Sequence, residues 1–142
     1  MPVEFRLKST FRAGRLIRTG NGYRIFLTES DEAIKPEVLL QSQAADWMER
    51  NYRQIAEIPT AYFDLIFFTD PPVILPDLSG LRRIANDRAG LIICEFPETD
   101  FSKYDRDLAE IGFKQEQELS GVAGNTCYYY VLQQIGCCGI TY

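Results

Sequence analysis

The sequence predicts an α/β fold: a mixed sheet with a parallel βαβ core, an N-terminal β-hairpin, a C-terminal antiparallel hairpin, and helices that cover the sheet. Three observations predict it. A tight-turn signal separates two strand patterns near the start, apolar runs alternate with helical patterns from residue 61, and two further strand patterns flank a short turn near the end.

Composition indicates one globular domain over residues 1–142. Of these residues 46% are hydrophobic and 25% are charged, which separates the chain from disordered sequences. A chain of this length should bury roughly two-thirds of its unfolded surface. The N-terminus lacks the apolar run of a signal peptide, and no stretch approaches the ~20 apolar residues that span a bilayer. We therefore expect a cytoplasmic protein that does not engage a membrane.

The N-terminal region predicts strands and a hairpin. Apolar and polar residues alternate over residues 5–12, and "GRLIR" and "YRIFLTE" flank "TGNG". Asn21 and Gly22 favour the positive φ angles of a tight turn. Gly20, Asn21 and Gly22 also form a minimal G-x-G, but a strand follows it, which leaves no helix N-terminus for a phosphate.

A long helix is predicted over residues 36–58, beginning at Pro36, which suits a first helical position. One apolar stripe joins Leu40, Ala44, Trp47, Met48 and Ile55, so the helix should cover a sheet. Trp47 is either a core residue or an exposed recognition residue, and its place in the stripe favours the core.

From residue 61 strands and helices should alternate. "YFDLIFF" is typical of a strand buried on both faces. Residues 75–90 predict a helix with Gly90 as its left-handed stop, and "LIICEF" predicts a second buried strand. Residues 99–113 predict another helix, capped by Asp100 or Ser102 and ended by Gly112. This order favours right-handed crossovers and a parallel strand pair.

The last predicted elements are two antiparallel strands, "FKQEQELSG" and "NTCYYYVLQQ", joined by "GVAG". Tyr128, Tyr129 and Tyr130 must alternate between the faces of their strand. They either form an aromatic binding platform or pack under a helix, and packing is favoured.

Charge is unevenly distributed. The net charge of −5 divides into +5 over residues 1–28 and −10 over the rest. A basic end of this kind can steer nucleic acid or an acidic protein toward the hairpin. The alternative is that these cations lie on a solvated sheet face or pair with the acidic remainder. The six candidate contact residues are Arg6, Lys8, Arg12, Arg15, Arg18 and Arg24.

Several kinds of chemistry are excluded or disfavoured. The chain has no histidine, which removes the usual general base and every His-dependent triad. Four cysteines, Cys94, Cys127, Cys137 and Cys138, are too few and too unevenly spaced for a disulfide framework, so we expect thiols in packing or tail positions. The spacing of Cys137 and Cys138 does not suit a metal, and no metal site is predicted.

One motif suggests a reaction centre. "FDLIFFTDPP" runs an apolar strand into Asp70, Pro71 and Pro72, and the carboxyl end of a parallel strand opens into the ligand crevice of an α/β sheet. Asp70 is otherwise an ordinary strand terminator.

Residues 61–134, with "FDLIFFTDPP", "GLIICEF", "LAEIGF" and "TCYYYVLQQ" in that order, resemble the C-terminal half of class I S-adenosylmethionine-dependent methyltransferases. The resemblance implies a βαβαββ half-domain beside the basic hairpin region of residues 1–30. It implies that Asp70, Pro71 and Pro72 lie over the methyl donor and hold a target amine. Glu29 either corresponds to the acid that holds the ribose of S-adenosylmethionine or is a surface acid, and the hairpin before it favours the surface acid. The glycine-rich cofactor loop of that family is not found, and Val73 stands where amino-methylating members place an aromatic residue.

Three functions follow as hypotheses. The first is a degenerate methyltransferase-like domain, a pseudoenzyme that acts as a binding or adaptor module. The second is an active S-adenosylmethionine-dependent methyltransferase on an amine or nucleobase. The third is a GNAT-like acyltransferase, which "IGFKQEQEL" and "YYYVL" also resemble. The tail "IGCCGITY" either covers a sheet edge or pairs with a second copy, so oligomerisation stays open.

Overall fold

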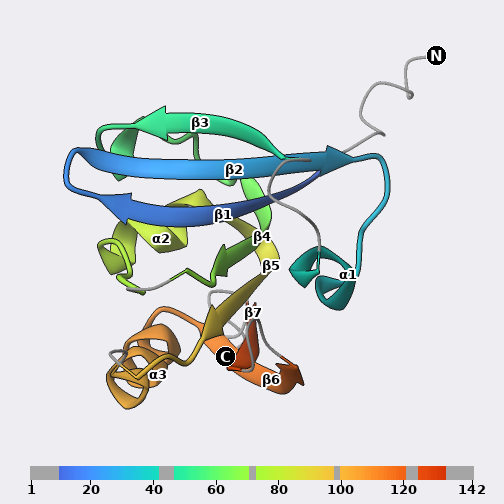
Figure 1. The fold of residues 1–142 in the computed structure, drawn as a ribbon, viewed down its shortest axis with the longest axis vertical. Helices are drawn as coiled ribbons and strands as arrows, with labels where there is room; N and C mark the ends of the chain where they lie inside the picture. Colours follow the sequence, from blue (N-terminus) through green and yellow to red (C-terminus); the bar gives the residue numbers. More distant parts are fainter. Residues whose placement is uncertain (1–9, 42–46, 71–72, 98–99, 121–124, 134–142) are drawn as a thin grey trace, which may run out of the picture.

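A computed structural model describes residues 10–41, 47–70, 73–97, 100–120 and 125–133. They form an α/β fold around one seven-stranded mixed sheet of order β3-β2-β1-β4-β5-β7-β6 (Figure 1). The strands are β1 (Phe11–Thr19), β2 (Gly22–Ser30), β3 (Met48–Tyr52), β4 (Phe63–Phe68), β5 (Ala85–Cys94), β6 (Phe113–Ser120) and β7 (Thr126–Leu132). The helices are α1 (Pro36–Leu40), α2 (Leu78–Ile84) and α3 (Phe101–Glu110), with a 3-10 turn at Ile55–Glu57.

The predicted fold class is confirmed. β4 is parallel to both of its neighbours, β1 and β5, and the remaining pairs are antiparallel. The N-terminal hairpin turns through Gly20 and Asn21. Thr19 pairs with Gly22, whose φ is 145°. β6 and β7 form the predicted C-terminal hairpin.

The strand registers define two faces of the sheet. Gly14, Ile66, Leu91 and Tyr130 are successive cross-strand neighbours on one face, which we call the α3 face because Tyr130 Oη donates to Asp105 of α3 at 2.8 Å. The next set along, from Arg15 through Phe67 and Ile92 to Tyr129, lies on the opposite side. We call that side the α1 face.

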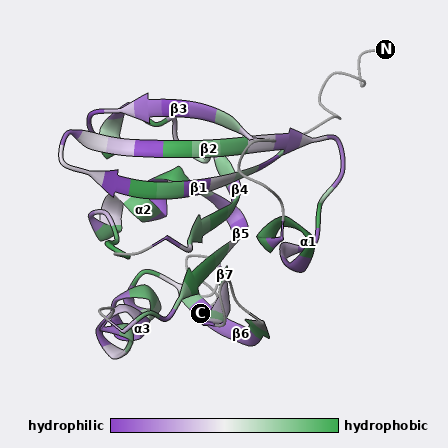
Figure 2. Ribbon diagram, in the orientation of Figure 1, coloured by the Kyte–Doolittle hydropathy of each residue, from purple (hydrophilic) through white to green (hydrophobic). Residues whose placement is uncertain are grey.

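The core follows β4, the central strand. All of its residues except Asp64 are buried, and Figure 2 shows β4 in hydrophobic colours and β3, at the edge of the sheet, in hydrophilic ones. A strand with parallel partners on both sides and covered faces is expected to be apolar throughout.

The predicted helix over residues 36–58 is wrong. α1 ends at Leu40, residues 48–52 form the edge strand β3 against β2, and a 3-10 turn follows. The part of the prediction at residues 42–46 lies outside the described residues. Trp47 is buried, as predicted, but Met48 is 46% exposed. The stripe was misleading because pairing with β2 satisfies the backbone of residues 48–52 and overrides helix propensity.

The predicted helix over residues 75–90 is also too long. α2 ends at Ile84, and β5 begins at Ala85, so Gly90 lies inside a strand and is no helix stop. Gly90 is needed for another reason: a Cβ there would lie 2.7 Å from Tyr129 Cε1 and 2.8 Å from Leu65 Cδ1. A side chain at this position would collide with both neighbours.

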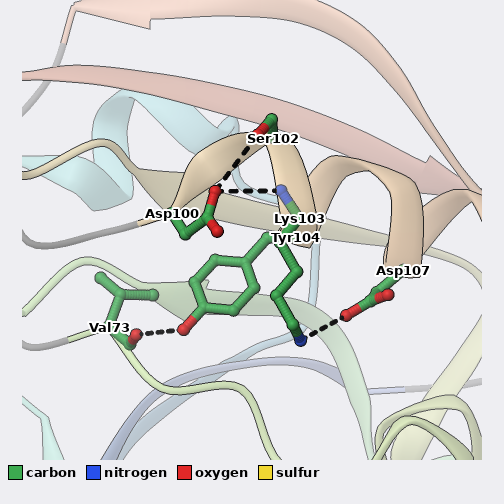
Figure 3. A network of polar contacts seen from close by, with 6 residues as sticks. All are labelled: Val73, Asp100, Ser102, Lys103, Tyr104 and Asp107. Carbon is green, nitrogen blue, oxygen red and sulfur yellow. Dashed lines mark hydrogen bonds and ion pairs between the residues drawn. The ribbon is translucent and has the colours of Figure 1, made fainter.

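α3 forms as predicted. The Asp100 side chain accepts from the backbone N–H of Lys103 at 3.4 Å, which caps the first turn (Figure 3). Gly112 follows the helix at a φ of 104°, a conformation that glycine adopts without strain.

The prediction that the cysteines are free thiols is wrong for one pair. Cys94 and Cys127 lie directly opposite each other on β5 and β7 and form a disulfide, with their Cα atoms 4.0 Å apart. Both side chains are buried. Cys137 and Cys138 lie outside the described residues. Within the described ranges no helix has the length and apolar character needed to cross a membrane.

Candidate functional site

Asp70 lies just beyond the carboxyl end of β4, and its side chain is exposed. Thr69, the residue before it, is buried. Because β4 is parallel to β1 and β5, this edge of the sheet is where an open α/β fold places its ligand crevice. Pro71 and Pro72 lie outside the described residues, so the role of the motif stays a prediction.

Arg15 fills the α1 face beside this strand end. Its guanidinium donates from Nη1 to Thr69 Oγ1 at 3.0 Å and from Nη2 to the Leu39 carbonyl at 2.9 Å. It also lies over the rings of Trp47 and Phe67, at 4.7 and 5.1 Å from the ring centroids. Arg15 is only 8% exposed.

Burial lowers the pKa of Arg15, and the nearby Asp70 carboxylate partly opposes that shift. A guanidinium remains charged through such a shift because its ordinary pKa lies far above neutrality. Asp70 therefore lies beside a buried cation.

The segment after the Asp-Pro-Pro motif is anchored to α3. Tyr104 Oη donates to the Val73 carbonyl at 2.7 Å, and Figure 3 shows the Tyr104 side chain reaching from α3 to this carbonyl. Val73 itself is buried. Its side chain is therefore committed to the core, and it presents no aromatic surface beside Asp70.

The structure does not bring Glu29 together with Asp70. Glu29 is opposite Arg12 near the amino end of β1, and β1 runs parallel to β4. Glu29 therefore lies at the amino edge of the parallel strands, whereas Asp70 lies at their carboxyl edge. Its carboxylate forms an ion pair with Arg12 at 2.8 Å.

The residues at the end of β1 do not fit S-adenosylmethionine. Family members hold that cofactor with a glycine-rich loop between a strand and a helix, whereas β1 turns through Gly20 and Asn21 directly into β2. No helix N-terminus lies there to receive the cofactor.

The six candidate cations have different surroundings. Arg12 is half-buried and is held by Glu29, by the Tyr62 carbonyl at 3.0 Å and by the Tyr62 ring, whose centroid is 4.1 Å away. Arg15 is buried, as described above. Both guanidiniums are therefore committed to internal contacts. Arg6 and Lys8 lie outside the described residues.

Arg18 and Arg24 lie at the other end of the hairpin, near its turn, and both are exposed. Arg18 lies over the Tyr23 ring, 5.5 Å from its centroid, and Arg24 pairs with Glu49 at 3.2 Å. β3 brings Arg53 to the same place. The sequence prediction missed Arg53 because it assigned residues 48–58 to a helix.

Two hollows of about 600 and 410 Å³ open at this turn end. We define the turn end as the residues that line them: Arg18, Thr19, Gly20, Asn21, Gly22, Tyr23, Arg24, Asn51, Tyr52, Arg53, Gln54, Ile55 and Glu57. Three arginines and one glutamate, Glu57, line the hollows, and Glu49 lies beside Arg24, so the positive charges there exceed the negative ones by one.

The three neighbouring tyrosines divide as predicted between the faces. Tyr128 packs on Phe101 of α3 with ring centroids 4.2 Å apart, and Tyr130 is buried beneath the same helix. Burial and the bond to Asp105 raise the pKa of Tyr130. Packing under a helix is confirmed for these two, whereas Tyr129 lines a cavity on the α1 face.

The described residues include no group of three or more side chains suited to a metal ion. No protein-family model matches the sequence, and no curated protein matches it. Among solved structures, a variant of the 16S rRNA (adenine(1408)-N(1))-methyltransferase from Catenulisporales acidiphilia is similar over 57% of each chain, with 20% identity and a TM-score of 0.37.

Proposed function

We propose that this protein is a non-catalytic binding module, built on a methyltransferase-like half-domain, that holds single-stranded nucleic acid at the turn end. One observation carries the proposal: Arg53, which directly follows β3, lines both hollows of the turn end, one together with Arg24 and the half-buried Tyr52, the other together with Arg18. Cationic grooves with aromatic side chains are the usual means of binding single strands without sequence preference.

The guanidinium groups of two of these arginines are available to a ligand. With the residues that the structure describes, the Arg53 guanidinium forms no hydrogen bond or ion pair, and that of Arg18 has only its contact with Tyr23. Arg24 pairs with Glu49, but both side chains are exposed, so the pair can exchange for a phosphate at little cost.

The turn itself also suits a phosphate backbone. Gly20 is exposed, and a Cβ placed there would meet nothing within 4 Å, so the chain leaves open space beside the turn. Glu57 is the one acid of the turn end, and it accepts from the backbone N–H of Arg53 at 3.1 Å. This bond holds the acid against the chain.

Fluorescence anisotropy with labelled oligo-uridine and oligo-deoxythymidine tests the proposal. Three phosphate contacts on a single strand give a slope of about −2 for log affinity against log salt, so a fourfold rise in salt should weaken binding about 20-fold. Arg53→Ala removes one phosphate contact and should make the slope less negative by about 0.7. Arg106→Ala, on the exposed side of α3, is the matched control and should leave the slope unchanged.

Two outcomes would contradict the proposal. Affinity that stays flat as salt rises would exclude phosphate contacts. Binding of a polyglutamate peptide as tight as that of the oligonucleotides would assign the surface to acidic proteins, because glutamate side chains offer charge without bases that stack on the half-buried Tyr52.

Methyl transfer is the second candidate function. It is favoured by the position of β4, parallel to both neighbours, with an exposed Asp70 beyond its carboxyl end. It is disfavoured by the hairpin at the end of β1 and by the Arg15 cation beside Asp70, because the sulfonium of S-adenosylmethionine is itself cationic. Calorimetric titration with S-adenosylmethionine decides: heat of binding with a rise in the melting temperature would favour this candidate.

A further inference from the structure

A cavity of about 550 Å³ opens on the α1 face at the amino end of β4, at the opposite edge of the sheet from Asp70. Its walls include apolar residues from four segments: Phe11, Ile34, Pro36, Leu65 and Gly90. Asp64, Lys35, Arg88 and Tyr129 add polar groups. A mostly apolar hollow of this volume with a few convergent polar groups is typical of a small-molecule site.

The local backbone is built to form this cavity. The pairing of β4 with β5 passes from Phe63–Ala85 to Leu65–Gly90, so residues 86–89 bulge out of β5. Within the bulge Arg88 has a φ of 62°, a conformation that costs energy for any residue except glycine. Gly90 then leaves room for the Tyr129 ring to lie across β5 beside Leu65.

Asp64 presents a positioned acceptor to the cavity. Its Oδ2 accepts from the Arg12 N–H at 2.9 Å, and its Oδ1 accepts from Asn86 Nδ2 at 2.8 Å. A carboxylate offers about four lone-pair sites, so about one remains on each oxygen. The free sites suit a ligand edge with two adjacent N–H donors. Guanine has such an edge in its N1–H and N2–H groups, whereas adenine places an acceptor beside its amino group.

Lys35 and Arg88 complement an anion. Both are exposed at the cavity, and within the described ranges neither side chain forms a hydrogen bond or ion pair. The Tyr129 side differs, because burial together with Glu116 and Glu37 raises the pKa of Tyr129 and keeps the phenol protonated as a donor. The polar lining of the cavity thus comprises two cations, the Asp64 carboxylate and a protonated phenol.

We infer that this cavity binds a guanine mononucleotide, with the base edge on Asp64 and the phosphate on Lys35 and Arg88. The site is separate from the turn end, and the inference does not depend on the function proposed for that surface.

Isothermal titration of the full chain with GMP, AMP, guanosine and inorganic phosphate tests the inference. GMP should bind, and each of the other three should bind at least about tenfold more weakly, because hydrogen bonds to charged groups are lost. Asp64→Asn should remove the preference for GMP over AMP, since the amide replaces one acceptor with a donor.

Arg88→Gly is the most informative variant. Glycine adopts the positive φ of this position without strain, so the fold should keep or gain stability while the guanidinium is lost. GMP affinity should fall about tenfold and guanosine affinity should stay the same. Arg106→Ala, on α3 at the other face, is the control and should bind GMP as the natural chain does.

Three results would overturn the inference: no heat with GMP, equal affinity for GMP and AMP, or a GMP affinity that Arg88→Gly leaves unchanged. The last would locate nucleotide binding elsewhere, the turn end included. If Asp64→Asn fails to fold, the Arg88→Gly variant and the comparison of the two nucleotides still decide.

Discussion

Arg15 lies on β1 and Arg53 directly follows β3, in one three-stranded segment of order β3-β2-β1, yet the surroundings of the two arginines are opposite. Arg15 is 8% exposed, and its guanidinium contacts Thr69, the Leu39 carbonyl and two aromatic rings. Arg53 is exposed, and its side chain lines two hollows. The comparison teaches that a cluster of basic residues in a sequence is not a basic surface. The inner half of the hairpin is the part away from the turn, which includes Gly14 and Arg15. There arginine stabilises the fold, whereas the arginines of the turn end are available to a partner.

The largest expected effect is at Arg15. Arg15→Ala should lower the free energy of unfolding by about 3 kcal/mol, because it leaves a cavity beside Trp47 and removes the partners of Thr69 and the Leu39 carbonyl. Arg15→Met should cost clearly less, since it keeps the apolar stem and removes a buried charge. Urea denaturation followed by circular dichroism measures both. An Arg15→Ala loss below about 1 kcal/mol would show that the inner half does not depend on this cation.

Glycines sharpen the same comparison. A Cβ at Gly14, in the inner half, would lie 2.4 Å from Cε1 of the buried Phe63, whereas one at Gly20, in the turn, would meet nothing within 4 Å. Gly14→Ala should therefore destabilise the fold by about 1–3 kcal/mol through overpacking. Gly20→Ala should change stability by less than about 1 kcal/mol, with a gain expected from the stiffer unfolded chain. Equal effects in thermal melts would contradict the difference in packing between the two regions.

Tyr130 gives a smaller, pH-dependent effect at the α3 end of the sheet. Its pKa is raised by burial and by the bond to Asp105, so the folded state holds this proton more tightly than the unfolded state. The resulting stability is fully present below the ordinary tyrosine pKa of about 10 and should be lost as pH rises above it.

Tyr130→Phe should cost about 1 kcal/mol at neutral pH, because it removes one hydrogen bond. It should also flatten the decline in unfolding free energy above pH ~10. Chemical denaturation at several pH values measures both quantities. A decline of the same steepness in the variant would assign it to other groups.

The smallest effects on stability are expected at the turn end. Arg18→Ala and Arg53→Ala should each change the unfolding free energy by less than about 0.5 kcal/mol, since both side chains are exposed and make few internal contacts. Thermal melts of the two variants measure this. A larger loss would move either residue into the structural group with Arg15.

The elements that could be predicted from the sequence are those with local signals. Asn21 and Gly22 mark the first hairpin, Asp100 and Gly112 mark the ends of α3, and the apolar run ending at Phe68 marks the central strand. Each signal acts within a few residues of the structure that it specifies.

The rest depended on contacts between distant segments. Residues 48–52 carry a helical stripe, and only their pairing with β2 makes them a strand. The position of Gly90 in the sequence is typical of a helix stop. In the structure glycine is needed there because the Tyr129 ring leaves no room for a side chain. Arg18 and Arg24 could be predicted from the distribution of charge along the sequence. Arg53 and the Asp64 cavity could not, because both depend on strand pairings that bring distant segments together.

The most direct measurement determines stability and oligo-uridine binding together for Arg15→Met and Arg53→Ala. If the hairpin divides as described, Arg15→Met changes the free energy of unfolding and leaves the salt slope of binding intact. Arg53→Ala then makes that slope less negative by about 0.7 and leaves stability unchanged. If Arg53→Ala does not alter the slope, or if Arg15→Met makes it less negative to the same extent, the division of the hairpin into a structural part and a binding part is contradicted.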